Sequence, residues 1–104
     1  MNLLFHIRHL HLQDAQKEMI SQKVEKLSHL ADRLRDESCE FRLDLVHHDT
    51  RAVEDSYEAR LTIFAPGETL HVEAYTETLE NSVDAMIEKM KKQIEHYKAK
   101  LHHA

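Results

Sequence analysis

The sequence predicts an α+β fold in the order β-α-β-β-β-α, with a four-stranded mixed sheet and two helices packed on one face. Four short segments alternate apolar and polar residues, which is typical of half-buried strands. Two longer segments repeat apolar residues every three or four positions, which indicates helices. Each element has a single apolar side, so both helices are expected on the same face of the sheet. The 104 residues fit one domain, residues 1–104.

The first half of the chain is predicted to form a strand, a helix and a second strand. Residues 3–9 alternate and predict the first strand. Asp14 is suited to cap the helix that follows, whose apolar positions recur up to about Arg35. Residues 39–47 alternate again and predict the second strand. A helix joins the two strands, so they should pair in parallel through a right-handed crossover if they are neighbours.

The second half is predicted to add a hairpin and a long helix. The polar stretch 47–56 reads as a loop, and a third strand follows with Tyr57 to Ile63 facing inward at every second position. The sequence Ala65-Pro66-Gly67-Glu68 predicts a tight turn, because Pro presets one central φ and Gly supplies the positive φ of the next. A fourth strand then uses Leu70, Val72 and Ala74 as its inward residues.

The last helix is predicted to be capped by Thr76 or Thr78 and to end near Leu101. Residues 89–103 carry five lysines and one acid, although the net charge of the chain is -5. Two basic stripes follow the helical period: Lys89, Lys92, His96 and Lys100 on the last helix, and Lys23, Lys26 and His29 on the first. Side-by-side helices would let these stripes face each other across a groove, which suits a phosphate backbone. The pattern is equally typical of a solvated helix face.

Signatures of catalysis are missing from the sequence. The one Gly is too few for a phosphate-cradling loop, which needs several. Cys39 lies on the inward side of a predicted strand, where a buried small hydrophobe is the better interpretation. The single cysteine fits a reducing compartment, and the His and Arg of the N-terminal segment exclude a signal peptide or membrane span. We therefore expect a cytoplasmic protein that is not an enzyme.

The charged and histidine side chains of the strands predict a solvated surface. The ten histidines are interpreted as surface residues, although a weak metal site at His6, His9 and His47 stays open. The outward sheet face interleaves acids with three arginines, which predicts cross-strand charge pairs. These arginines are Arg8, Arg42 and Arg60. No cofactor, structural metal or small-molecule substrate is expected.

The stretch ARLTIFAPGETLHVEAYTETLENSVDAMIEKMKKQIEHYKAKL, residues 59–101, resembles the ribosome hibernation-promoting factor family. This family includes the ribosome-associated translation inhibitors, also described as sigma-54 modulation proteins. The resemblance covers essentially the whole chain and includes the basic-hydrophobic repeat of the first helix. The matching positions are Thr62-Ile63, Pro66-Gly67, Leu70 with Ala74, Val83-Asp84, Lys89-Met90, Gln93-Ile94, Lys98 with Lys100, Lys23-Val24 and Lys26-Leu27.

The resemblance implies a double-stranded-RNA-binding-like fold that binds the small ribosomal subunit and its ribosomal RNA. Such a protein would occupy the channel of messenger and transfer RNA and inhibit translation by steric occlusion. The implied RNA contacts are basic residues of both helices: Lys23, Lys26, Lys89, Lys92 and Lys100, with Lys91 and Lys98 as secondary candidates. It also implies a short form, without the second, dimer-forming domain of long family members.

Several residues depart from the family pattern and leave alternatives open. His29 and His96 stand where the family usually has Lys or Arg, and the acids near the last helix would repel phosphates if they shared the lysine face. These acids are Glu77, Glu80, Asp84 and Glu88. One alternative is a diverged module of the same fold that binds a protein partner through the mixed-charge sheet face. The other is a small metal-dependent enzyme that uses the histidines.

Overall fold

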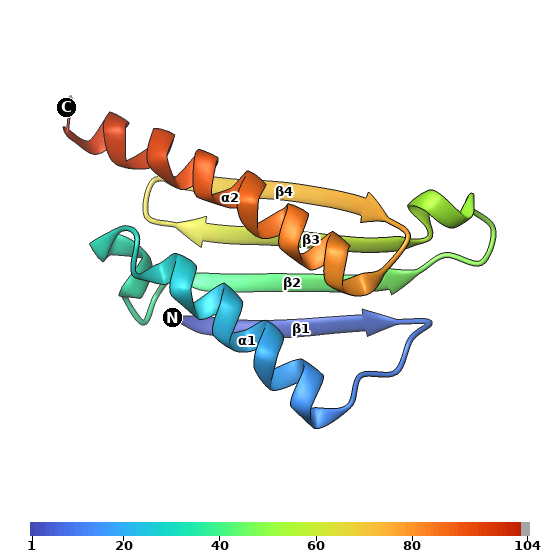
Figure 1. The fold of residues 1–104 in the computed structure, drawn as a ribbon. Coiled ribbons are helices and arrows are strands. Elements are labelled where there is room, and N and C mark those ends of the chain that lie inside the picture. The colour runs from blue at the N-terminus through green and yellow to red at the C-terminus, as the bar shows by residue number, and fades with distance from the viewer. Residues whose placement is uncertain (103–104) are drawn as a thin grey trace.

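A computed structural model describes residues 1–102 and shows two helices on one face of a four-stranded sheet (Figure 1). The strands lie in the order β1-β2-β3-β4, with β1 parallel to β2 and the other neighbours antiparallel. The predicted fold class and element order are confirmed. The elements are β1 (Asn2–Arg8), α1 (Asp14–Ser28), η1 (Asp32–Arg35), β2 (Glu40–His47), η2 (Val53–Asp55), β3 (Tyr57–Ala65), β4 (Glu68–Thr76) and α2 (Leu79–His102).

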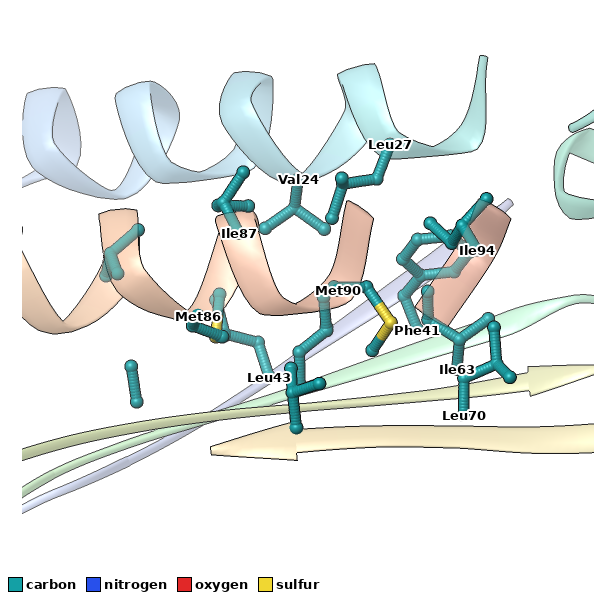
Figure 2. Packing of buried hydrophobic residues seen from close by; sticks show 14 of the residues in the cluster. Val24, Leu27, Phe41, Leu43, Ile63, Leu70, Met86, Ile87, Met90 and Ile94 are labelled. Atoms are coloured by element: carbon teal, nitrogen blue, oxygen red, sulfur yellow. The ribbon is translucent and has the colours of Figure 1, made fainter. Parts of the chain in front are cut away.

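The core lies between the helices and the inner face of the sheet. The strand register places Phe5, Leu43, Leu61 and Val72 in one row across all four strands. Apolar residues of the helices close over such rows, as Figure 2 shows for Val24, Leu27, Met86 and Met90. Leu43, Leu61 and Met90 are fully buried. Burial of each such side chain contributes roughly 1.5–3 kcal/mol to folding.

Cys39 belongs to this core and not to a reactive site. Its side chain is fully buried and forms no disulfide. Burial raises the pKa of its thiol above the ordinary 9.0, because the thiolate would lose its hydration. The prediction of a buried small hydrophobe at this position is confirmed.

The first helix ends earlier than the sequence predicts, at Ser28 and not near Arg35. The amides of His29 and Leu30 bond to carbonyls three residues back, and Ala31 is extended with φ -148° and ψ 132°. The chain then turns through η1, which places fully buried Leu34 in the core before β2 begins. This break returns the chain to the edge of β1, where a straight helix could not lead.

The predicted turn and one of the two predicted caps are confirmed. Gly67 has φ 80°, in the left-handed region that favours glycine, between β3 and β4. The hydroxyl of Thr78 accepts a 3.1 Å hydrogen bond from the amide of Asn81, so Thr78 caps α2. Asp14 is not the cap of α1. The cap is Gln13, whose backbone amide donates to the side-chain Oε1 of Gln16 at 3.1 Å, and Asp14 is the first helical residue.

None of the helices within residues 1–102 is both long enough and apolar enough to cross a membrane.

Candidate RNA-binding surface

The two helices lie side by side over the sheet, as the sequence requires for a shared basic surface (Figure 1). A 2.7 Å ion pair between Lys23 of α1 and Asp84 of α2 bridges them. Beneath this bridge, a groove of about 500 Å³ has apolar side chains from both helices on its floor, among them Leu27 and Ile87. The helices therefore form one continuous surface that faces away from the sheet.

The basic stripes of the two helices do not face each other across this groove, so that expectation is wrong. At roughly 100° per residue, the buried stripe of α2 separates two polar flanks. The flank toward α1 carries Asp84, Glu88 and Lys91, which line the groove with Lys23 and Lys26. The opposite flank lies over β4. Lys89 and Lys100 contact β4 from this flank, and the helical period places Lys92 and His96 between it and the solvent side. These four residues of the predicted stripe are named the outer flank.

Ion pairs largely neutralise the lysines of the groove. Lys23 is held by Asp84, and Lys91 lies 3.2 Å from Glu88. Lys26 forms no ion pair with any residue of the described chain, 1–102. Lys98 lies beyond the groove, beside Leu30 and Leu101, and likewise has no ion pair there. The groove thus has a mixed rim, which makes it a weaker phosphate site than the sequence pattern suggests.

The outer flank carries no acid of α2. Glu80, Asp84 and Glu88 project toward the α1 side, where Glu80 lines a hollow with Gln16 and Met19. Glu80 and Asp84 therefore lie away from Lys89 and Lys100. Glu88 and Glu95 stand four residues before and three residues after Lys92, so both neighbour Lys92 on the helix surface. Lys89 donates to the carbonyl of Glu73 at 2.8 Å, and Lys100 pairs with Glu68 of β4 at 2.9 Å. Lys92 has no ion-pair partner among residues 1–102.

Sequence reasoning missed that side chains on this side of α2 also form hydrogen bonds with the exposed edge of β4. The Gln93 amide donates to the carbonyl of His71 at 2.9 Å and accepts from its backbone amide at 3.2 Å. It pairs with the edge much as a neighbouring strand would. Lys89 bonds the same edge one step along, while Met90 and Ile94 are buried. The one sequence feature that could have indicated this edge contact is the pair Lys89 and Gln93, four residues apart and each followed by a buried apolar residue.

The histidines form no metal site in the described chain. His6 lines a hollow on the outer sheet face, whereas His9 and His47 line a separate pocket of about 740 Å³ at one end of the sheet. Within residues 1–102, no group of three or more His, Cys, Asp or Glu side chains is placed to hold a metal. The weak site of His6, His9 and His47 that the sequence left open is thus contradicted.

A buried carboxylate organises the charges of the outer sheet face. Glu58 is 5% exposed and lies 2.7 Å from both His48 Nε2 and Arg60 Nε. Burial alone would raise the pKa of Glu58. The His48 hydrogen bond and the Arg60 charge outweigh that effect, so the pKa lies below the ordinary 4.5. Arg60 also reaches Glu73 at 3.5 Å. The predicted cross-strand charge pairing is therefore confirmed for Arg60.

The family model of the sigma-54 modulation protein / S30EA ribosomal protein matches residues 3–102. The chain belongs to this family. Membership of the family places the chain among ribosome-associated proteins involved in hibernation and translation regulation. No curated protein sequence matches the chain significantly.

Two solved structures of low sequence identity support the same fold. The crystal structure of the Thermus thermophilus Protein Y N-terminal domain has a TM-score of 0.74 at 19% identity. That comparison covers 93% of this chain and 99% of that chain. A ribosomal subunit interface protein from Coxiella burnetii has a TM-score of 0.71 at 20% identity, covering 95% of this chain and 99% of that one.

Proposed function

We propose that this chain binds the small ribosomal subunit through its helices and blocks the channel of messenger and transfer RNA. The observation that carries the proposal is the outer flank of α2, a row of cations in which Glu88 and Glu95 neighbour only Lys92 and Glu68 of β4 pairs with Lys100. From Lys89 to Lys100 the row is roughly 16 Å long, at 1.5 Å per residue, and spans several phosphates of an RNA strand. Its rigid position on the sheet edge reduces the entropy lost on binding.

The mechanism is occlusion and requires no chemical step. Phosphate contacts attract and orient the domain, and the shape of the two-layer fold then decides where it fits. The candidate contacts divide into two groups. Lys89, Lys92 and Lys100 form the primary group. Lys23, Lys26 and Lys91 line the mixed-charge groove, with Lys98 beyond it, and this group contributes less because two of its members, Lys23 and Lys91, must give up ion pairs. In the primary group, within residues 1–102, only Lys100 must do so, from Glu68.

Titrated co-sedimentation with purified small subunits tests the proposal. Three phosphate contacts predict that affinity falls about forty-fold between roughly 50 and 200 mM salt, whereas seven predict several thousand-fold. The variant Lys92→Glu/Lys100→Glu should weaken binding at least a hundred-fold. The matched control Lys91→Glu/Lys98→Glu makes the same charge change on the α1 side and should weaken it far less.

A competition experiment tests the position on the subunit. Bound protein should prevent a messenger RNA with its initiator transfer RNA from occupying the small subunit, and excess of both should displace the protein. Absence of sedimentation at low salt would reject ribosome binding. Sedimentation without competition would reject the channel as the site. Equal losses in the two double variants would reject the outer flank as the primary contact.

A further inference from the structure

The face of the sheet opposite the helices carries a second charged hollow, of about 570 Å³. Both helices cover the other face, so this side of the sheet is not covered by them (Figure 1). The strand register places Leu4, Arg42, Thr62 and His71 in one row across the four strands. The next row holds His6, Asp44, Arg60 and Glu73. The hollow lies over these rows, between Arg8 at one end and Phe64 at the other.

Two guanidinium groups in this hollow have no ionic partner. Arg60 is occupied by Glu58 and Glu73. Arg8 and Arg42 are both exposed, and neither forms an ion pair with any residue of the described chain. The prediction of cross-strand charge pairs is therefore wrong for Arg8 and Arg42. Arg42 and Arg8 occupy positions about 13 Å apart along the strand direction, far enough to contact different anionic groups of one ligand.

An exposed aromatic ring completes the hollow. Phe64 is 40% exposed, on the same face as Arg42 and diagonal to it across β2 and β3. Asp44, which also has no ion pair within residues 1–102, adds a hydrogen-bond acceptor between the arginines. These groups match the parts of unpaired RNA nucleotides. The ring can stack on a base, the acceptor can bind donors on the edge of that base, and the two guanidinium groups can bind phosphates.

We propose that this hollow binds unpaired nucleotides of RNA, with Phe64 stacking on a base and Arg8 and Arg42 contacting phosphates. An acidic protein segment would satisfy the arginines equally, but it would gain no stacking from Phe64, and Asp44 repels its carboxylates as it repels phosphates. RNA is the occupant that uses all of these groups. The site goes beyond the proposed function, because it lies on the opposite layer from the helix lysines and does not require them.

Fluorescence anisotropy of the full chain with a labelled eight-nucleotide oligouridylate tests the site. Replacing Phe64 with Leu keeps an apolar side chain but removes the ring, and should weaken binding about tenfold through lost stacking. Arg42→Gln should also weaken binding and flatten its salt dependence. Two phosphate contacts predict about a sevenfold fall in the affinity of the unmodified chain between roughly 50 and 200 mM salt. Arg33→Gln in η1 is the control: it also removes one exposed positive charge, outside both proposed surfaces, and should change binding little.

Each outcome decides for or against the sheet face. Selective loss in Phe64→Leu and Arg42→Gln, with circular dichroism showing that both variants fold, supports the site. Unchanged binding in Phe64→Leu, or an equal loss in Arg33→Gln, overturns it. A labelled decaglutamate peptide that binds as tightly as the oligonucleotide and depends on the same residues would also overturn it in favour of an acidic protein partner. Failure of ribosome co-sedimentation would not affect this result, because the probe is a free oligonucleotide.

Discussion

Replacing Gln93 with Ala removes both hydrogen bonds between this side chain and the outer edge of β4, and leaves the bond of Lys89 to Glu73 in place. The Gln93 amide meets the backbone of His71 at 2.9 and 3.2 Å. After the change, the N–H and C=O of His71 at this edge can bond only to water. The core is untouched, because Met90 and Ile94 keep their places under the helix. The experiment therefore isolates the stability that the Gln93 bonds to this edge provide.

The expected loss follows from these two bonds. Each intramolecular hydrogen bond contributes about 0.5–1.5 kcal/mol net, and these two are partly exposed, so together they provide about 1–2 kcal/mol. Alanine returns a few tenths of a kcal/mol through its higher helix propensity. A net loss of about 1 kcal/mol lowers the melting temperature of a domain of this size by about 5 °C.

Thermal unfolding followed by circular dichroism measures this loss, with Glu95→Ala as the matched control. Glu95 is exposed on the same helix and makes no hydrogen bond within residues 1–102, so its replacement should not lower the melting temperature. Amide hydrogen exchange gives a local readout, because the His71 amide should exchange about tenfold faster in Gln93→Ala. A melting temperature within one degree of the Glu95→Ala value would show that the edge bonds contribute nothing and that the reasoning is wrong.

Substitutions at three further positions test other parts of the fold. The lowered pKa of Glu58 makes its ionised form stabilising above the ordinary 4.5, and this contribution is lost as pH falls through the folded pKa. Glu58→Gln should therefore be less stable by about 1–3 kcal/mol in urea unfolding at neutral pH, and its deficit should shrink between roughly pH 5 and 3. A deficit independent of pH would contradict this. Gly67→Ala should cost about 1 kcal/mol in thermal melting because of the positive φ, and Gly67→Asn less; equal costs would contradict the turn argument. Met90→Ala should cost about 2–5 kcal/mol in urea unfolding, and a smaller loss would mean that the core closes around the gap.

Most of the fold could be predicted because its strands and helices bury one side only. Alternation marked every strand, and Pro66 with Gly67 marked the hairpin. The end of α1 could not be predicted, because Leu27 and Leu34 are seven residues apart and would lie on one stripe of an unbroken helix. What breaks the helix is the need to bring the chain back beside β1. That need depends on the tertiary arrangement and leaves no periodic signal.

The candidate site was only partly predictable, because a helical stripe does not reveal which neighbour it faces. The spacing of Lys89, Lys92 and Lys100 correctly grouped them on one side of α2. Only the packing shows that this side turns to β4, while Lys91 turns to the groove. Ion pairs across the sheet were also only partly predictable from the sequence. Arg60 and Arg42 look alike in sequence, but only Arg60 has carboxylates close enough to bind it.

Because side chains of α2 bond the edge of β4, the two edge strands of the sheet differ in how exposed their backbone groups are. Within residues 1–102, no side chain bonds the free edge of β1 between Leu3 and Arg8 as Gln93 bonds β4. Strand addition to β4 would have to displace Gln93 and Lys89, whereas addition to β1 between Leu3 and Arg8 displaces no side-chain bond of the described chain. Two copies that join through β1 use up both unblocked edges, and each presents outside a β4 edge that Gln93 and Lys89 already bond. This asymmetry favours a pair over growth into a filament.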